Sequence, residues 1–173
     1  MSFLGRKILN LRTHPKKDKK GKTEALNYES STTFGLLYTW ENTLKTEIIE
    51  SFAKELSNEG KNVTNLCYNP LKEAIDCLHP TFGIDDLSSF GKIKSEVAEH
   101  FMKNQFDYLL LLDFELSEIT GHICATSNAS YKIGIHQKQT EDYFDLMVQI
   151  NTSAGLEHYI EQLIKYIKLI KHE

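Results

Sequence analysis

Short, nearly continuous hydrophobic runs alternate along this chain with segments whose hydrophobic residues recur every three or four positions. Runs of the first kind are typical of strands that are covered on both faces, as in a parallel sheet. They predict strands at 33–39, 61–68, 106–113 and 130–136, and a less regular edge strand at 143–150. Because the run at 106–113 contains four successive leucines, we expect it at the centre of the sheet.

The segments with helical spacing predict helices between these strands. The helices are expected at about 44–56, 95–103, 117–125 and 156–170. The expected end residues are Asn42 or Thr43 and Gly60 for the first helix, Ser117 at the start of the third, and Thr152 or Ser153 at the start of the last. The stretch 71–94 is less regular, and there we predict only a short helix at 71–78 and a short strand near 81–84.

This alternation of strands and helices predicts the α/β class, as a three-layer sandwich around a mostly parallel, Rossmann-like sheet. A strand, a helix and a strand within about 35 residues form a right-handed crossover unit. With 173 residues, 40% of them hydrophobic, the chain fits a single domain that needs neither disulfides nor a metal for its core. We assign that domain to residues 30–173.

Charge divides the chain into two unlike parts. Residues 1–23 carry eight basic side chains and one acidic one, a balance of +7, whereas residues 24–173 carry twelve basic and twenty-three acidic side chains, a balance of −11. We therefore predict a basic, mobile N-terminal tail over residues 1–29. Its basic residues are the expected contacts for a protein partner or an anionic membrane surface: Arg6, Lys7, Arg12, Lys16, Lys17, Lys19, Lys20 and Lys22.

Cysteine use and hydropathy indicate a cytoplasmic location. Cys67, Cys77 and Cys124 are odd in number and contain no C-x-x-C pair, so we expect free thiols rather than a disulfide framework or a zinc site. No hydrophobic run reaches the length of about 18 residues that spans a membrane, and no export signal is visible. Peripheral attachment to a membrane through the tail remains compatible with this location.

The known cofactor and catalytic motifs are absent from the sequence. The first strand and the residues after it contain only Gly35, which lies inside the strand, so the glycine-rich turn that binds a dinucleotide is missing, as is the P-loop. The seven histidines are scattered singly, and neither the metalloprotease nor the hydrolase signature occurs. We therefore expect no cofactor and no metal, and we lean against an enzymatic function.

Candidate ligand-binding residues follow from the predicted sheet. Ligands of open parallel sheets bind beyond the carboxyl ends of the strands, where the strand order reverses. The polar and aromatic side chains expected there are Trp40, Glu41, Asn69, Asp113, Glu115 and His136. Asp113 stands out because a carboxylate at the end of a central strand, beside a helix N-terminus, can bind a ligand hydroxyl. Packing of Trp40 and capping by Asp113 of its own turn are the alternative interpretations.

Two resemblances accompany these residues. The segments 34–38, 86–91, 106–113, 131–134 and 142–147 resemble a family of short, uncharacterised bacterial proteins with a Lys-rich N-terminus, which implies a Rossmann-like fold without an assigned activity. The segment from Phe106 to Gly134 is similar, more loosely, to the acceptor-side half of heptosyltransferase-like glycosyltransferases. Those enzymes bind a nucleotide-sugar in a second Rossmann-like domain, for which 173 residues leave no room, so independent catalysis is not expected.

Three functions remain open from the sequence. The first is a non-catalytic or regulatory Rossmann-like module that its basic tail attaches to a membrane surface or a protein partner. The second is a binding module, or a small enzyme, for a sugar- or nucleotide-like ligand at the point where the strand order reverses. The third is association with nucleic acid or the ribosome through the tail, which the acidic body disfavours.

Overall fold

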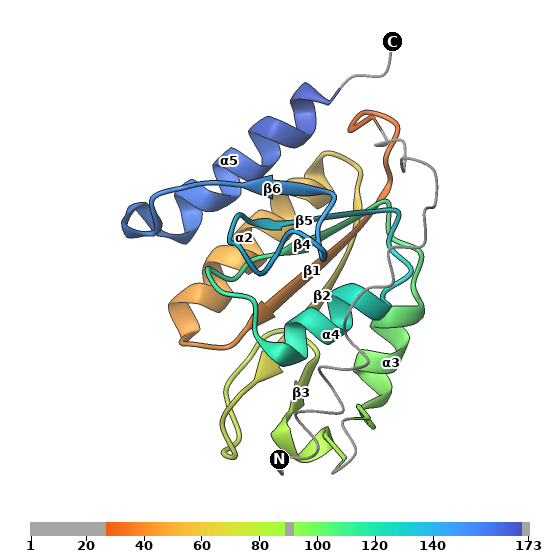
Figure 1. Cartoon of the computed structure of the whole chain (residues 1–173), viewed down its shortest axis with the longest axis vertical. Coiled ribbons are helices and arrows are strands. Elements are labelled where there is room, and N and C mark those ends of the chain that lie inside the picture. Colours follow the sequence, from red (N-terminus) through yellow and green to blue (C-terminus); the bar gives the residue numbers. More distant parts are fainter. Residues whose placement is uncertain (1–26, 89–91, 171–173) are drawn as a thin grey trace.

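A computed structural model of the chain describes residues 27–88 and 92–170 (Figure 1). It contains six strands, four α-helices and two short 3-10 turns. In chain order they are β1 (Thr33–Thr39), α2 (Thr43–Asn58), β2 (Asn62–Asn69), β3 (Thr81–Gly83), η1 (Ile84–Asp86), α3 (Glu96–Lys103), β4 (Tyr108–Leu111), α4 (Glu118–Thr126), β5 (Tyr131–Ile135), β6 (Leu146–Val148), η2 (Thr152–Ala154) and α5 (Gly155–Leu169).

The six strands form one sheet in the order β3-β2-β1-β4-β5-β6, and every neighbouring pair is parallel. This is the strand order of the Rossmann fold. The α/β prediction is confirmed, and the sheet described here is parallel throughout rather than mostly parallel. The leucine-rich strand β4 lies beside β1 in the middle of the sheet, as its four fully buried positions require.

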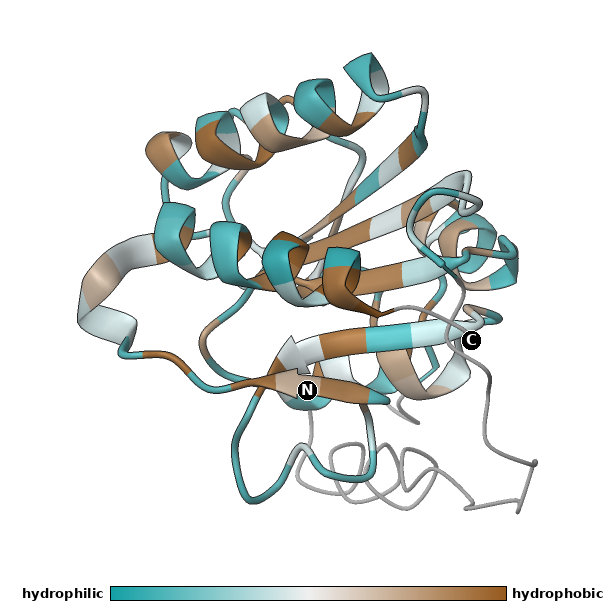
Figure 2. Cartoon of the chain, turned by 90° about the horizontal axis from the view of Figure 1, so that it is seen from above, coloured by the Kyte–Doolittle hydropathy of each residue, from teal (hydrophilic) through white to brown (hydrophobic). Residues whose placement is uncertain are grey.

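Helices cover both faces of the sheet, which gives the three layers. Figure 1 shows α2 and α5 on one face and α3 and α4 on the other. Each face encloses its own hydrophobic core, built around Phe34, Leu36 and Tyr38 on the α2 side and around Leu109 and Leu111 on the α4 side. In Figure 2 the hydrophobic positions gather on the strands and on the helix surfaces that face them.

Two of the crossover connections contain no α-helix. The connection between β2 and β3 is irregular, so the helix predicted at 71–78 is wrong. Its two leucines, Leu71 and Leu78, are 44% and 65% exposed, and the positions that do pack on the core, Ile75 and Cys77, are two residues apart and not at helical spacing. Instead, the Asn69 side chain accepts a hydrogen bond from the Leu71 amide and donates one to the Glu73 carbonyl, which holds a turn.

The connection between β5 and β6 packs directly on the sheet through Phe144. A Cβ atom at Gly134 would lie 2.5 Å from the ring of Phe144, so only glycine leaves room for that ring. Gly35 has the same role under Phe106, at 2.8 Å. These two aromatic rings fill space on the α3 and α4 side of the sheet.

Most helix ends lie where the sequence predicts them. Asn42 caps α2 and Ser117 caps α4, each accepting a backbone amide hydrogen bond with its side chain. Gly60 follows α2 with φ of 80°, the left-handed conformation expected of it. The helix predicted at 156–170 is confirmed as α5, but its predicted cap at Thr152 or Ser153 is wrong, because these two residues lie in the 3-10 turn η2, which Asn151 caps, and α5 begins at Gly155.

Among the described residues, the first that packs into the core is Tyr28, which is 3% exposed. The buried Lys61 ammonium donates to the carbonyls of Tyr28 and Ser31, and Asp107 accepts the amides of Thr32 and Thr33. The eight basic residues of the predicted tail lie outside the described residues. Within residues 27–88 and 92–170, no helix combines the length and the apolar character that crossing a membrane requires.

Candidate functional site

A crevice lies where the strand order of the sheet reverses, between the carboxyl ends of β1 and β4. The chain continues from β1 toward β2 on one side and from β4 toward β5 on the other, so the segments after these two strands diverge. The space between them has a volume of about 370 Å³. Its lining residues are Thr39, Glu41, Asp113, Phe114, Glu115, Leu116 and Ser117.

Asp113 forms the floor of this crevice and is 4% exposed. Its carboxylate accepts the Thr39 amide at 2.9 and 3.0 Å and the Thr39 hydroxyl at 2.7 Å. It also accepts the Lys45 ammonium at 2.8 Å. Asp113 is therefore held by the end of β1 and the start of α2, and not by its own turn, which excludes the capping interpretation.

Lys45 reaches the crevice from the first turn of α2. Its side chain is 8% exposed and pairs with both Asp113 and Glu41. Burial raises the pKa of Asp113, whereas the Lys45 charge and the Thr39 donors act against that rise. A buried ion pair with this many hydrogen bonds fixes the geometry of the two segments that it joins.

The walls of the crevice are partly apolar. Phe114 and Leu116 follow Asp113, and the Phe114 ring lies against Tyr159 of α5 with ring centroids 5.8 Å apart. Gln137 donates to the Phe114 carbonyl at 2.8 Å, which ties the wall to the end of β5. The result is a hollow with a fixed polar floor and an apolar side, the usual composition of a small-molecule site.

A second, smaller hollow adjoins the crevice at Glu41 and Phe114, which line both. Its volume is about 150 Å³, and Leu44, Ile48 and Leu156 make it mainly apolar. Together the two hollows reach the lower part of the range of about 300–1,000 Å³ that is typical of ligand pockets.

The start of α2 is capped by the Asn42 side chain, which disfavours a phosphate site there. The Asn42 side chain accepts a hydrogen bond from the Lys45 amide, and the Lys45 ammonium donates to Asp113. In dinucleotide-binding Rossmann folds the pyrophosphate sits at this helix N-terminus, reached through a glycine-rich turn. The segment Trp40-Glu41-Asn42 has no such glycine.

Three of the six predicted ligand-binding residues line the crevice: Glu41, Asp113 and Glu115. The other three lie elsewhere. Trp40 packs against the core on the α2 side, because it continues the alternation of Leu36 and Tyr38. Asn69 serves the turn after β2, and His136 is exposed at the end of β5, two strands from β1.

Five residues at or beside the crevice were not among the predicted ligand-binding residues: Thr39, Lys45, Phe114, Leu116 and Ser117. Lys45 did carry a signal, because it lies four residues before Ile49 on the buried stripe of α2. A lysine on the apolar side of a helix needs an acceptor inside the fold. Asp113 was the available carboxylate at the end of the central strand.

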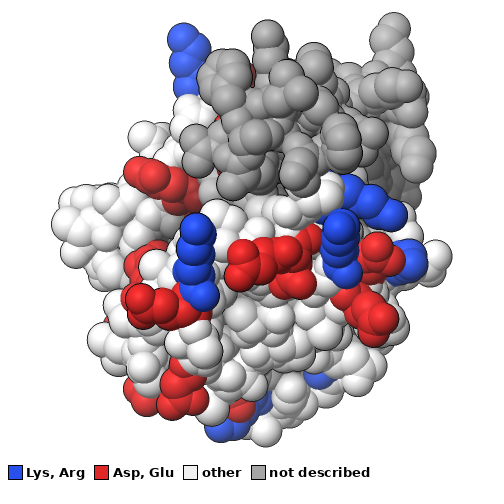
Figure 3. All heavy atoms as spheres, turned by 90° about the horizontal axis from the view of Figure 1, so that it is seen from below, with Lys and Arg blue, Asp and Glu red and all other residues white. Residues whose placement is uncertain are grey.

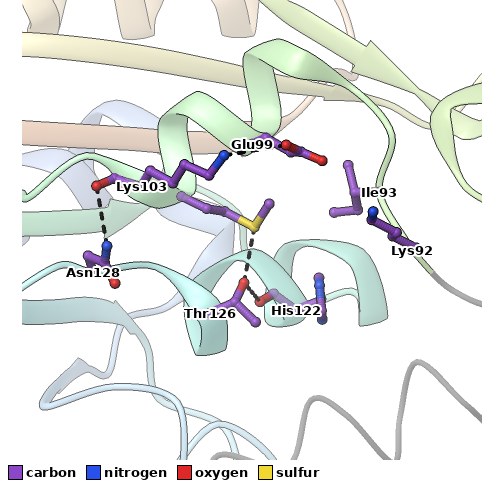
Figure 4. Close-up of a pocket in the computed structure, with 8 residues that line it drawn as sticks. Lys92, Ile93, Glu99, Lys103, His122, Thr126 and Asn128 are labelled. Atoms are coloured by element: carbon purple, nitrogen blue, oxygen red, sulfur yellow. Dashed lines mark hydrogen bonds and ion pairs between the residues drawn. The ribbon is translucent and has the colours of Figure 1, made fainter.

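Two other hollows lie on the helix layers. The one between α3 and α4 has a volume of about 320 Å³ (Figure 4). As Figure 4 shows, its polar groups bond within the protein: Thr126 donates to the His122 carbonyl, Asn128 donates to the Lys103 carbonyl, and Lys103 pairs with Glu99.

The hollow between α2 and α5 is larger, at about 570 Å³, and acidic. It has an apolar floor of Ile48, Phe52 and Ile160 and four glutamates around it, namely Glu47, Glu55, Glu157 and Glu161. Among the described residues no three His, Cys, Asp or Glu side chains come together as ligands of a metal ion.

Comparison with known proteins agrees with the lack of a recognisable reaction motif. No protein with a curated description matches the sequence. One family model does match, that of a family of unknown function, DUF6913, and the match covers residues 2–170. Since it spans nearly the whole chain, the protein belongs to this uncharacterised family.

Proposed function

We propose that this protein is a binding module for a small polyhydroxylated ligand, such as a sugar or a nucleoside, in the crevice between β1 and β4. The observation that supports this most is the position of a hollow of about 370 Å³ at the reversal of strand order, with Asp113 fixed as its floor. At its rim the exposed carboxylates of Glu41 and Glu115 can accept hydrogen bonds from ligand hydroxyl groups, and Phe114 offers an apolar surface to a ring.

The charges of the crevice residues favour a neutral ligand. Glu41, Asp113 and Glu115 face a single cation, Lys45, which is already paired with two of them. A phosphate would meet net repulsion here, whereas a neutral ligand would not. The looser resemblance of 106–134 to a glycosyltransferase half gives a further reason to test sugars first.

The same contacts favour binding over catalysis. Asp113 accepts four hydrogen bonds, and Lys45 is held between two carboxylates, so neither is poised to move a proton to or from a substrate. A small enzyme acting on the same class of ligand is the alternative. Turnover of any ligand that the screen below identifies would favour it.

The screen compares wild type with Glu115→Gln, which keeps the size of an exposed side chain but removes its charge. A panel of neutral sugars, nucleosides and their phosphates is added to each, and the shift in melting temperature is recorded, with Glu141→Gln as the control. We expect a neutral compound to stabilise wild type and the control but to lose most of its effect in Glu115→Gln. Equal shifts in all three proteins would place the ligand elsewhere.

A second function is favoured by the charge division of the chain. We propose that the basic N-terminal tail attaches the protein to an anionic membrane surface or to an acidic protein partner. Residues 1–23 carry +7 and the remainder −11. On the face seen in Figure 3, acidic side chains gather in several groups with lysines between them, so the body adds little attraction for an anionic surface.

Sedimentation with vesicles of phosphatidylcholine, with and without phosphatidylserine, tests this second function. The full chain is expected to sediment only with the anionic vesicles and less as salt is raised, and removal of residues 1–23 is expected to abolish it. Unchanged sedimentation after the removal would contradict it. Salt-dependent binding of nucleic acid in place of vesicles would favour the third function instead.

We further propose that the protein is bacterial and cytoplasmic. The family resemblance supports the first point. The three cysteines, Cys67, Cys77 and Cys124, are free, which supports a reducing compartment.

A further inference from the structure

A chain of polar side chains lies under the irregular connection between β2 and β3, on the α2 side of the sheet. The Tyr38 hydroxyl lies 2.7 Å from Nδ1 of His79 and 3.3 Å from the Sγ atom of Cys77. On the other side of the imidazole, Nε2 lies 2.9 Å from a Glu50 carboxylate oxygen. Four residues from a strand, a helix and the connection thus form one continuous path from a thiol to a carboxylate.

The chemistry of the groups fixes the direction of these hydrogen bonds. The hydrogen bond with His79, together with Lys54, lowers the pKa of Glu50, so this carboxylate only accepts. Nε2 of His79 must therefore carry the proton that it shares with Glu50. In a neutral imidazole Nδ1 then accepts from the Tyr38 hydroxyl. The remaining lone pairs of the Tyr38 oxygen accept the Cys77 thiol.

This arrangement can move a proton away from the thiol. The Cys77 proton passes to the Tyr38 oxygen while the Tyr38 proton passes to Nδ1, which leaves a thiolate at Cys77 and an imidazolium at His79. The imidazolium is stabilised by Glu50, and the re-formed Tyr38 hydroxyl donates to the thiolate. Tyr38 ends as it began, so its own acidity, which burial makes very weak, does not oppose the transfer.

Cys77 differs from the other two cysteines of the chain. Burial raises the pKa of Cys67 and of Cys124 to about 12, and both side chains are fully buried. Cys77 is partly exposed. Burial also acts to raise its pKa, but hydrogen bonds with Tyr38 and with the His79 backbone outweigh that effect and lower it. A partly exposed thiol with a lowered pKa has the properties of a reactive cysteine.

Cys67 lies beside Cys77 in the same cluster. It is the direct cross-strand neighbour of Tyr38 in the sheet, and each of the two thiols perturbs the pKa of the other. We propose that Cys77 is a nucleophilic thiol that hydroperoxides oxidise, activated by Tyr38, His79 and Glu50, and that Cys67 is its partner in a disulfide.

The reaction proceeds in two balanced steps. The Cys77 thiolate attacks a peroxide oxygen; an S–O bond forms, the O–O bond breaks, and the departing alkoxide takes the proton stored on His79, giving a sulfenic acid and an alcohol. The Cys67 sulfur then attacks the Cys77 sulfur; the S–S bond forms, the S–O bond breaks, and water leaves with the Cys67 proton. Two thiols are oxidised and one hydroperoxide is reduced.

Alkylation of the intact chain tests the activation. Limiting iodoacetamide is added at pH 7, and peptide mass spectrometry follows each cysteine with time. Cys77 is expected to react at least roughly tenfold faster than Cys67 or Cys124, since one unit of pKa changes the thiolate fraction about tenfold. The alkylation rate of Cys77 in the folded chain is corrected for its exposed fraction and compared with its rate in the urea-unfolded chain. Equal rates would overturn the proposal.

Variants of Glu50 separate its charge from its role in packing. Glu50→Gln still accepts the Nε2 hydrogen bond of His79 but no longer stabilises an imidazolium, so alkylation of Cys77 is expected to slow roughly tenfold while the circular dichroism spectrum is unchanged. Glu55→Gln, on the same helix and exposed, is the control and should react as wild type does. An unchanged rate in Glu50→Gln would show that the contact is only structural.

Hydrogen peroxide tests the partner. Wild type treated with about one equivalent is expected to lose two hydrogens and to give a Cys67–Cys77 peptide on non-reducing digestion. In Cys67→Ala the sulfenic acid at Cys77 should persist and be trapped by dimedone, whereas Cys124→Ala should behave as wild type. Oxidation of Cys77 without a disulfide in wild type would overturn the assignment of Cys67, and the absence of any oxidation at Cys77 would overturn the site.

Discussion

Replacing Lys45 by methionine tests whether the ion pair at the floor of the crevice fixes the ends of β1 and β4. The methionine keeps most of the side-chain volume but removes the ammonium that lies 2.8 Å from Asp113. The two side chains are 8% and 5% exposed, so water does not replace the lost charge. Asp113 would remain as a buried carboxylate supported only by Thr39.

The size of the effect follows from this burial. Removing one partner of a buried ion pair costs about 3–5 kcal/mol. The three hydrogen bonds from Thr39 remain, which places Lys45→Met near the lower end, at about 3 kcal/mol. For a chain of this length each kcal/mol lowers the melting temperature by about 2–4 °C, so a fall of roughly 6–12 °C is expected.

Urea unfolding followed by circular dichroism measures the loss, together with Asp113→Asn and the double variant. Asparagine still accepts from Thr39 and removes the uncompensated charge, so the double variant should be less destabilised than the sum of the two single variants by at least about 1.5 kcal/mol. A loss below about 1 kcal/mol for Lys45→Met, or strict additivity, would refute the reasoning.

Three further predictions concern the fold. Gly134→Ala should cost about 1–3 kcal/mol in urea unfolding, because its Cβ would lie 2.5 Å from the Phe144 ring, and Phe144→Leu in that background should recover part of the loss. Asn42→Ala removes the side-chain cap of α2 and should cost about 1 kcal/mol in the same assay. The Tyr28 hydroxyl and Lys168 lower the pKa of Glu59, so its stabilising effect should be present above about pH 4.5 and lost as the pH falls through the lower native pKa. Melting temperatures of Glu59→Gln and wild type should therefore converge in acid, and a constant difference would contradict this.

Hydrophobic periodicity was enough to predict the sheet and its helices. The continuous runs at β1 and β4 could only be strands with cover on both faces, and the order of elements then led to a Rossmann-like sheet. The connection at 71–78 could not be predicted in this way. Its leucines have helical spacing, but the sheet offers them no buried surface, and a turn held by Asn69 replaces the helix.

The candidate site was only partly visible in the sequence. Topology placed Glu41 and Asp113 together because parallel strands end at the same edge. Topology alone did not exclude Trp40. The alternation of side chains along β1 would have excluded it, because it places Trp40 on the same face as Leu36 and Tyr38, against the core. The path from Cys77 to Glu50 had no sequence signal, because it joins a strand, a helix and an irregular connection through side-chain contacts alone.

The most direct test of the proposed ligand site is a nuclear magnetic resonance titration of the ¹⁵N-labelled full chain with the neutral sugar or nucleoside that stabilises it best. Binding in the crevice predicts amide shifts that saturate together and are confined to residues 39–41 and 113–117 and their contacts. Two results would contradict binding in the crevice. One is amide shifts centred on the hollow between α3 and α4 or on the hollow between α2 and α5, and the other is the absence of saturable shifts with every neutral member of the panel.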